Sequence, residues 1–305
     1  MSERIKILTI SDHPMLPSGV GTQTKYMIEA LLKSDKFEVV SLGAAIKHPS
    51  YDTIAPEPYE GRWKIIPVDG YGDPSIIRSI LAGFKPDILY FMTDPRFYSW
   101  LWDMEHEIRS SIPLVYYHVW DNKPYPIFNK IYYNSTDVIA TISKVTSDIV
   151  QTVSPQTWEQ YVPHAVDTEI FKPVESLAEE EKYNKMREGI PGLNDKMLFF
   201  WNNRNARRKQ SGSLIFWFKD FLDRVGHDKA VLLMHTDIHD EHGQPLDYLI
   251  SNLGLDKGQV VFSTQKYPAE ELSYLYKISD CTINVADAEG FGLGTLESLA
   301  CETPI

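Results

Sequence analysis

The chain has 305 residues, which is long enough to fold as two α/β domains that each bury a core. Its formal net charge of −12 disfavours sequence-independent nucleic-acid binding, because that binding depends on contacts between Lys or Arg and phosphate. Hydrophobic residues make up 43% of the chain, which is ordinary for a soluble globular protein.

Two further features bear on where the protein works. No apolar run approaches the length of a membrane span, and the run near the N-terminus is too short for a signal peptide. Cys281 and Cys301 lack metal-ligand or redox spacing, and we interpret them as reduced core residues of a cytoplasmic protein. A weak peripheral membrane contact stays open, although no basic amphipathic helix supports one.

The first half of the chain alternates short apolar runs with helix-like stretches. Residues 5–10 (IKILTI) predict a buried parallel strand, and residues 22–33 predict an amphipathic helix. Further strand-like runs follow at residues 39–42, 63–68, 87–92, 113–119 and 138–143. This βαβα order predicts a parallel sheet covered by helices on both faces.

Three residues of this half are candidates for a binding site. Gly19 and Gly21 open the first predicted helix, where a G-x-G pattern alone also fits an ordinary strand-to-helix turn. His118 ends a predicted strand, the position at which open α/β sheets place their ligands. A histidine in an apolar strand is also commonly a hydrogen-bonded core residue, so both interpretations of His118 stay open.

A charged, helix-prone segment divides the sequence. Residues 174–194 suit a surface linker between domains. We therefore expect an N-terminal domain of residues 1–173 and a C-terminal domain of residues 195–305.

The second half begins with a predicted strand at residues 197–201, followed by a basic loop. Arg204 and Lys209 lie in this loop, with Arg207 and Arg208 between them. Cations at the carboxyl end of a strand suit an anionic ligand, and the alternative is a solvated basic loop.

A loop rich in histidine and aspartate follows the next predicted strand. Its candidate metal ligands are His235, Asp237, His239, Asp240 and His242. They lack the i, i+4 helical spacing that is typical of a zinc site, so we predict no metal here.

The last stretch of the chain reads as strand, glycine-rich turn and helix. An apolar run at residues 281–285 leads into Gly290, Gly292 and Gly294, and apolar residues then recur at helical spacing. Such a turn presents backbone N–H groups and the positive end of a helix dipole to a ligand. Two carboxylates, Glu289 and Glu297, frame it.

This stretch resembles the donor-site signature of family 4 glycosyltransferases, which have the GT-B fold. The matching residues are Glu-Gly-Phe-Gly-Leu at 289–293, then Glu297, then Leu-Ala-Cys-Glu-Thr-Pro-Ile at 299–305. Glu302 stands where the family usually has Gly, so strain is expected at the end of this helix. Residues 162–172 (VPHAVDTEIFK) and the spacing of Arg204 and Lys209 also resemble family motifs.

The resemblance implies a division of roles. Arg204 and Lys209 would bind the donor diphosphate, Glu297 the ribose, and Glu289 with the amides of Gly290–Leu293 the transferred sugar. Gly19 and Gly21 would line the phosphate side, and His118 the sugar. The implied donor site is Gly19, Gly21, Arg204, Lys209, Glu289, Gly290, Phe291, Gly292, Leu293 and Glu297, with His118, Arg204, Lys209 and Glu289 as catalytic residues.

The implied fold is two Rossmann-like domains whose parallel sheets face each other across a cleft. The implied activity is sugar transfer, with retained anomeric configuration, from a UDP- or GDP-linked donor. No cofactor or metal is expected, and the acceptor is an unidentified sugar, lipid-linked molecule or protein.

The chain stops at Ile305, where the family continues, so the second domain is expected to be incomplete. Two rival functions stay open: an inactive or split donor-binding subunit, and a nucleotide-sugar epimerase of the same fold. The epimerase would need an acid/base set that the sequence does not reveal.

Overall fold

A computed structural model describes residues 3–120, 122–190, 192–193 and 195–305. These residues form two compact units, Met1–Ala165 and Val166–Ile305. No helix among them is long and apolar enough to cross a membrane.

Unit 1 is built on a parallel sheet with strand order β3-β2-β1-β4-β5-β6-β7. Its strands are β1 (Ile5–Asp12), β2 (Phe37–Ala44), β3 (Trp63–Pro67), β4 (Ile88–Met92), β5 (Leu114–His118), β6 (Val138–Thr141) and β7 (Trp158–Tyr161). Its helices are α1 (Gly19–Lys33), α2 (Pro74–Gly83), η1 (Pro95–Tyr98), α3 (Ser99–Asp103), α4 (Glu105–Arg109), η2 (Ile127–Asn129), α5 (Lys130–Asn134) and α6 (Lys144–Val153).

Both faces of this sheet are buried, as the continuous apolar strands predict. Ile7 and Val39 pack with Ile28 of α1 on one face. Their strand neighbours Leu8 and Val40 belong to the core on the other face, together with side chains from α2 to α6. Successive residues of a strand point to opposite faces, so the two cores form on either side of one sheet.

Unit 2 has a smaller parallel sheet with strand order β10-β9-β8-β11. Its strands are β8 (Met197–Asn202), β9 (Ala230–His235), β10 (Val260–Ser263) and β11 (Cys281–Thr282). Its helices are α7 (Leu177–Glu188), η3 (Arg207–Lys209), α8 (Ser211–Val225), α9 (Leu246–Asn252), α10 (Ala269–Lys277) and α11 (Leu293–Ala300).

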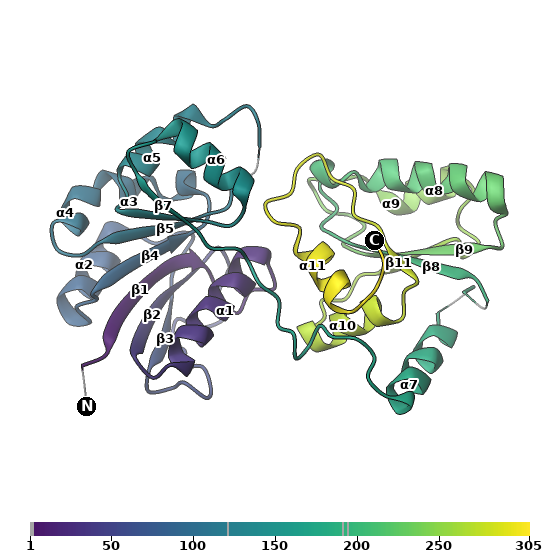
Figure 1. Ribbon diagram of the computed structural model, residues 1–305, viewed down its shortest axis with the longest axis horizontal. Coiled ribbons are helices and arrows are strands. Elements are labelled where there is room, and N and C mark those ends of the chain that lie inside the picture. The colour runs from purple at the N-terminus through teal and green to yellow at the C-terminus, as the bar shows by residue number, and fades with distance from the viewer. Residues whose placement is uncertain (1–2, 121, 191, 194) are drawn as a thin grey trace. The chain divides into compact units, whose positions relative to one another are not determined.

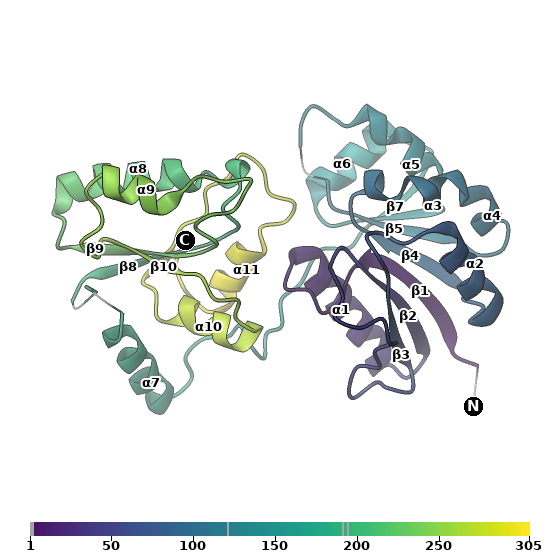
Figure 2. The same cartoon turned by 180° about the vertical axis from the view of Figure 1, so that it is seen from behind.

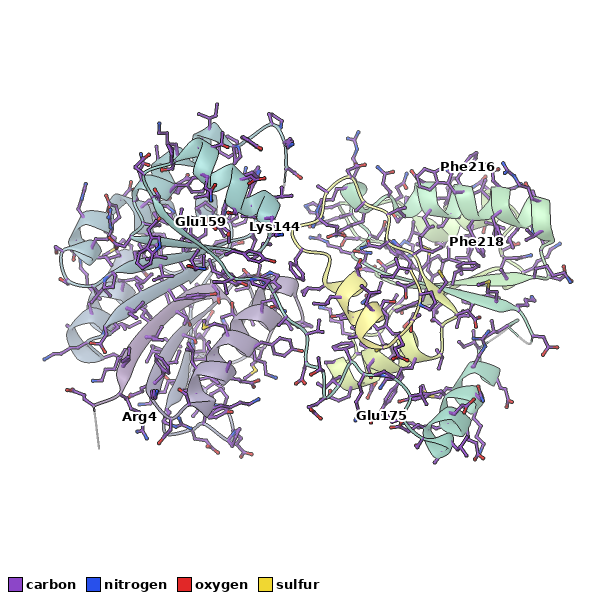
Figure 3. The ribbon with its side chains drawn as sticks, viewed as in Figure 1. Arg4, Lys144, Glu159, Glu175, Phe216 and Phe218 are labelled. Atoms are coloured by element: carbon purple, nitrogen blue, oxygen red, sulfur yellow. The ribbon has the colours of Figure 1, made fainter. Side chains whose placement is uncertain are left out.

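Two helical layers also cover the sheet of unit 2. Helices α8 and α9 lie on one face, and α10 and α11 lie on the other (Figures 1 and 2). The amphipathic pattern of α8 sets its orientation: Phe218 is 4% exposed and faces the core, whereas Phe216 is 51% exposed (Figure 3).

The boundary between the units differs from the predicted linker. It falls after Ala165, whose backbone N–H and C=O are both hydrogen-bonded by the Gln23 amide, at 3.1 and 2.7 Å. The segment predicted to be a linker instead contains α7, which belongs to unit 2. Tyr183 of α7 is 6% exposed and packs in the unit 2 core, and Met186 of the same, mostly charged helix packs against that core as well.

Two positions at which the sequence analysis singled out glycine, Glu302 and Gly21, have unusual backbone environments. Glu302 follows α11 with φ of 59°, the left-handed conformation that favours glycine, so the strain expected from the replaced Gly is present.

Gly21 is buried under the loop that leads into α1. A Cβ added there would lie 2.5 Å from the Leu16 carbonyl oxygen and 2.8 Å from the His13 carbonyl oxygen.

We predict that Gly21→Ala destabilises unit 1 by about 1–3 kcal/mol, because the added Cβ forces two backbone carbonyls to move. Gly83→Ala is the matched control in α2, where an added Cβ meets nothing within 4 Å, and it should be neutral or slightly stabilising. Urea unfolding of both variants tests this, and equal effects would contradict the packing role of Gly21.

Candidate functional site

The glycine-rich turn before α11 forms the centre of the candidate site. Gly292 caps the helix with φ of 81°, a left-handed conformation that reverses the chain direction in one residue. Within the described residues, the backbone N–H groups of Gly290 and Gly292 make no hydrogen bond. Phe291 and Leu293, the other two predicted residues of the turn, are half-buried. The turn therefore offers backbone donors next to the N-terminus of α11.

The basic loop of residues 204–210 lies directly against this turn. The Lys209 ammonium forms an ion pair with Glu289, and Arg208 Nη1 donates to the Ala288 carbonyl oxygen at 2.8 Å. Gln210 Nε2 donates to Asp287 Oδ1 at 2.8 Å. Two loops that lie about eighty residues apart in the sequence are thus fastened together at three successive positions.

Lys209 and Glu289 are sheltered from water to different extents. The Lys209 side chain is 8% exposed and that of Glu289 is 27% exposed. A cation this deeply buried needs a partner, because removing it from water costs several kcal/mol. The sequence placed both residues in one site, and the structure brings them into direct contact.

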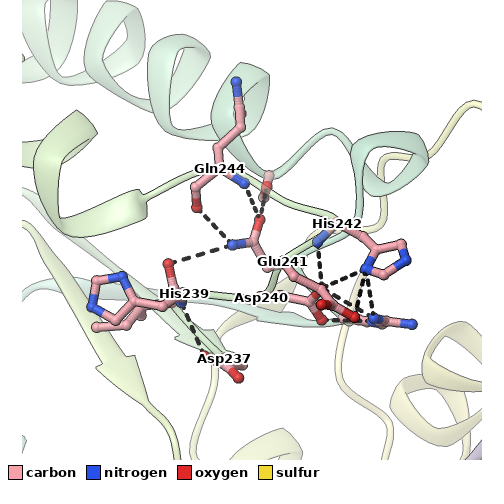
Figure 4. A network of polar contacts seen from close by, with 10 residues as sticks. Asp237, His239, Asp240, Glu241, His242 and Gln244 are labelled. Atoms are coloured by element: carbon pink, nitrogen blue, oxygen red, sulfur yellow. Dashed lines mark hydrogen bonds and ion pairs between the residues drawn. The ribbon is translucent and has the colours of Figure 1, made fainter.

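Arg204 is held by a different carboxylate. Its guanidinium donates to both oxygens of Asp240, at 2.6 and 3.0 Å, and its side chain remains 60% exposed (Figure 4). The Arg204 hydrogen bonds lower the pKa of Asp240 below its usual range. A bidentate pair fixes the guanidinium plane, so Arg204 presents its charge from a defined position.

The loop after β9, which contains the candidate metal ligands, anchors the basic loop. Buried Asn205 donates to the Gln244 carbonyl oxygen at 2.7 Å and accepts from Ser211 Oγ at 2.7 Å (Figure 4). A Cβ on Gly243 would lie 1.9 Å from the Asn205 carbonyl oxygen, so the two loops touch backbone to backbone. Among the described residues, no group of three His, Cys, Asp or Glu side chains is arranged to hold a metal ion.

Glu297 lies half-buried on α11, and its carboxylate has a partner that the sequence did not reveal. Tyr276 on α10 donates its hydroxyl to Glu297 Oε2 at 2.6 Å. The same phenol oxygen accepts a hydrogen bond from Asn202 Nδ2 at 2.9 Å. Tyr276 lies in an ordinary amphipathic helix pattern, so the sequence does not mark it as a site residue. Asn202 could have been found from the sequence, because it ends a strand, where open α/β sheets place their ligands.

Two buried polar atoms at the carboxyl edge of this sheet lack a hydrogen bond within the described part of the chain. They are Thr236 Oγ1, just after β9, and Asn284 Oδ1, just after β11. Buried polar groups are nearly always satisfied in native proteins, so such atoms point to a ligand or water at this edge. Ligands of open α/β sheets bind at this same edge.

In unit 1, His118 occupies the core rather than an open surface. It is 1% exposed, its Nδ1 lies 2.9 Å from the Tyr116 hydroxyl, and its Nε2 lies 2.5 Å from the Tyr133 hydroxyl. Burial lowers its pKa to about 3. Both ring nitrogens already have partners, which favours the core interpretation over a contact with the sugar.

The predicted glycines of unit 1 have different environments. Gly19 is exposed at the first residue of α1, and Gly21 is packed against the preceding loop. Ser18 caps this helix by accepting from the Gly21 N–H at 3.1 Å. The structure describes these glycines and the unit 2 residues in separate units.

Sequence reasoning missed Asp12, which ends β1. β2 and β4 lie on opposite sides of β1, so the strand order reverses at the carboxyl end of β1. Doubly wound sheets bind ligands at such a reversal. The carboxylate of Asp12 accepts hydrogen bonds from the hydroxyls of Ser18 and Thr93, each at 3.4 Å. Burial raises the pKa of this carboxyl. A half-buried carboxylate with such weak partners is a candidate for ligand binding.

The comparisons with known proteins agree with this architecture. Residues 193–305 match the family described as Glycosyl transferases group 1. No curated protein matches the chain. A solved structure of sucrose-phosphate synthase from Thermosynechococcus elongatus superposes with a TM-score of 0.77 at 16% identity, covering 99% of this chain and 80% of that one.

Two other solved structures are also similar. One, "Trehalose-6-phosphate from E. coli bound with UDP-2-fluoro glucose", has a TM-score of 0.71 at 10% identity and covers 97% of this chain and 81% of that one. A glycosyltransferase from Rickettsia africae has a TM-score of 0.71 at 16% identity and covers 99% of this chain and 78% of that one. These identities establish the fold, and the prediction of a GT-B fold with two Rossmann-like domains is confirmed.

The burial of His118 predicts a pH-dependent stability. Its pKa is about 3 in the folded protein and 6.5 in the unfolded chain, so the unfolded state takes up the proton first as pH falls. This contribution is intact above pH 6.5 and is lost progressively below it, by about 2 kcal/mol at pH 5. Urea unfolding at pH 7.5 and pH 5 should show a smaller pH effect in His118→Gln than in the wild type. An identical pH effect in both proteins would contradict the burial of a neutral histidine.

Proposed function

We propose that this protein is a family 4 glycosyltransferase that moves a sugar from a UDP- or GDP-linked donor to an acceptor, with retention of configuration. The observation that carries the proposal is the Lys209–Glu289 pair beside the Gly292-capped N-terminus of α11. That arrangement puts a cation, a carboxylate and backbone donors at one sheet edge. A nucleotide-sugar offers an anionic diphosphate and sugar hydroxyls, which need those three kinds of partner. Retention rests on the family resemblance alone.

The leaving group sets the electrostatic requirement of this reaction. When the bond between the sugar and the diphosphate breaks, negative charge grows on the diphosphate oxygens. Lys209, Arg204 and the exposed Arg207 supply positive charge around this loop, and the α11 amides add donors. We propose that these groups stabilise the leaving diphosphate without a metal ion or cofactor.

The two glutamates would then act on different parts of the donor. Glu297 has one oxygen held by Tyr276, and its Oε1 makes no hydrogen bond to another described residue, which suits a ribose hydroxyl. Glu289 sits on the turn itself, next to the Gly290 amide, and would contact the transferred sugar. Its ion pair with Lys209 would place the sugar and the diphosphate at adjacent points of the site.

The acceptor would be bound by unit 1. Asp12, at the reversal point of its sheet, is a half-buried carboxylate, a group that recognises sugar or polyol hydroxyls, and the buried Thr93 hydroxyl donates to it. We therefore assign the acceptor side to Asp12, and we give no ligand contact to His118, which the resemblance placed near the transferred sugar, because both of its ring nitrogens are engaged.

We predict that Lys209→Met lowers the turnover of donor hydrolysis by about 10²–10³-fold, because a charge-stabilising group is lost while the side-chain stem is kept. Lys47→Met, at an exposed position of unit 1, is the control and should have little effect. Release of UDP or GDP from its sugar conjugates is measured with and without EDTA, and thermal unfolding checks that both variants fold. Comparable turnover in the two variants would remove the diphosphate assignment.

We predict that Glu297→Gln lowers the affinity for UDP or GDP by about ten- to a hundredfold, because a charged acceptor to the ribose hydroxyls is lost. The fold should hold, since the amide oxygen still accepts from Tyr276. Glu289→Gln should reduce turnover and leave the affinity for free nucleoside diphosphate nearly unchanged. Isothermal titration of both variants measures this, and an equal loss in both would show that the roles are wrongly divided.

A further inference from the structure

We propose that Tyr276 is a positioning residue that fixes the Glu297 carboxylate for the ribose diol of the donor nucleotide. This inference rests on the proposed function. It assigns a role to a side chain that lies beneath the candidate site and that need not touch the ligand itself.

The phenol of Tyr276 is held rigidly. The residue is 0% exposed, and its ring packs edge-on against Phe200 at 5.0 Å and against Phe171 at 6.0 Å between centroids. The helix that carries Glu297 lies close above it, since a Cβ on Gly294 would be 3.3 Å from the Tyr276 hydroxyl. The hydroxyl therefore stays at one point below α11.

Hydrogen-bond chemistry fixes the direction of its single proton. The Asn202 amide nitrogen can only donate, so the phenol oxygen accepts from it at 2.9 Å. The one phenol proton is then available for Glu297 Oε2 at 2.6 Å. Burial raises the pKa of Tyr276 well above its usual value, so the phenol keeps that proton across the working pH range.

This hydrogen bond has two consequences for Glu297. It orients the carboxylate, holding Oε2 while Oε1 has no hydrogen bond to another described residue. It also opposes the effect of burial, which raises the pKa of Glu297, so it favours the ionised form. An ionised, oriented carboxylate can accept from neighbouring ribose hydroxyls, whereas a protonated one loses acceptor strength.

A purely structural hydrogen bond would stabilise the fold without affecting which nucleotide binds. If Tyr276 has a positioning role, loss of its hydroxyl should weaken the binding of a nucleotide that has both ribose hydroxyls more than the binding of one that lacks a ribose hydroxyl. The two roles are therefore separable with nucleotides that differ only in the ribose.

The experiment titrates Tyr276→Phe and the wild type with UDP, GDP and their 2′-deoxy analogues. We expect about a tenfold loss of affinity for the ribonucleotide that the wild type binds, and a clearly smaller loss for its 2′-deoxy form. Tyr183→Phe is the matched control, a buried tyrosine of the same unit that packs against Tyr274, and it should leave both affinities unchanged.

Two further readouts distinguish positioning from stability. Without the phenol, protonation of Glu297 should begin at a higher pH, so the affinity of Tyr276→Phe should fall at a higher pH than that of the wild type. In a Glu297→Gln background, adding Tyr276→Phe should change the affinity by less than about twofold, because the charged ribose acceptor that the phenol positions is already absent.

Each failure has a separate meaning. If the wild type binds none of the nucleotides, the proposed function fails. If the wild type binds and folded Tyr276→Phe loses affinity equally for ribo- and deoxynucleotides, or loses none, the positioning role is overturned. A full effect of Tyr276→Phe in the Glu297→Gln background would overturn it as well.

Discussion

The ion pair between Lys209 and Glu289 is the interaction on which the candidate site depends. It joins the loop after β8 to the loop after β11, and Arg208 and Gln210 add hydrogen bonds on either side of it. A lysine that is 8% exposed would be costly without a carboxylate partner, so loss of either residue leaves an uncompensated charge. The same ion pair thus holds the two loops together and places the Lys209 charge within the candidate site.

The other polar networks of unit 2 hold these loops and the Glu297 side chain in place through hydrogen bonds to neighbouring elements. Asp240 holds the Arg204 guanidinium, and Asn205 joins the basic loop to the loop after β9. Tyr276 and Asn202 connect the end of β8 to Glu297 on α11. Each network fixes a functional side chain through a backbone element that the sheet already holds in place, so the site is arranged before any ligand binds.

The sequence predicted the elements of the fold better than it predicted the contacts. Apolar runs such as IKILTI and MLFFW identified buried parallel strands, and Glu302 in place of Gly indicated the left-handed residue after α11. The segment predicted as a linker contains α7 of unit 2, because a charged helix with a single buried tyrosine looks exposed in sequence. The carboxylates were found through the resemblance, but Tyr276 was not, since its partner lies on another helix. His118 matched a family position, yet its two tyrosine partners become visible only in three dimensions.

The central claim is that the loops of unit 2 bind a nucleoside diphosphate. The most direct measurement is the unfolding stability of the wild-type protein in the presence of UDP, GDP or ADP. The account predicts that one of them, at a hundred times its dissociation constant, adds about 2.7 kcal/mol to the free energy of unfolding. Equal stability with and without all three nucleotides at millimolar concentration would contradict it.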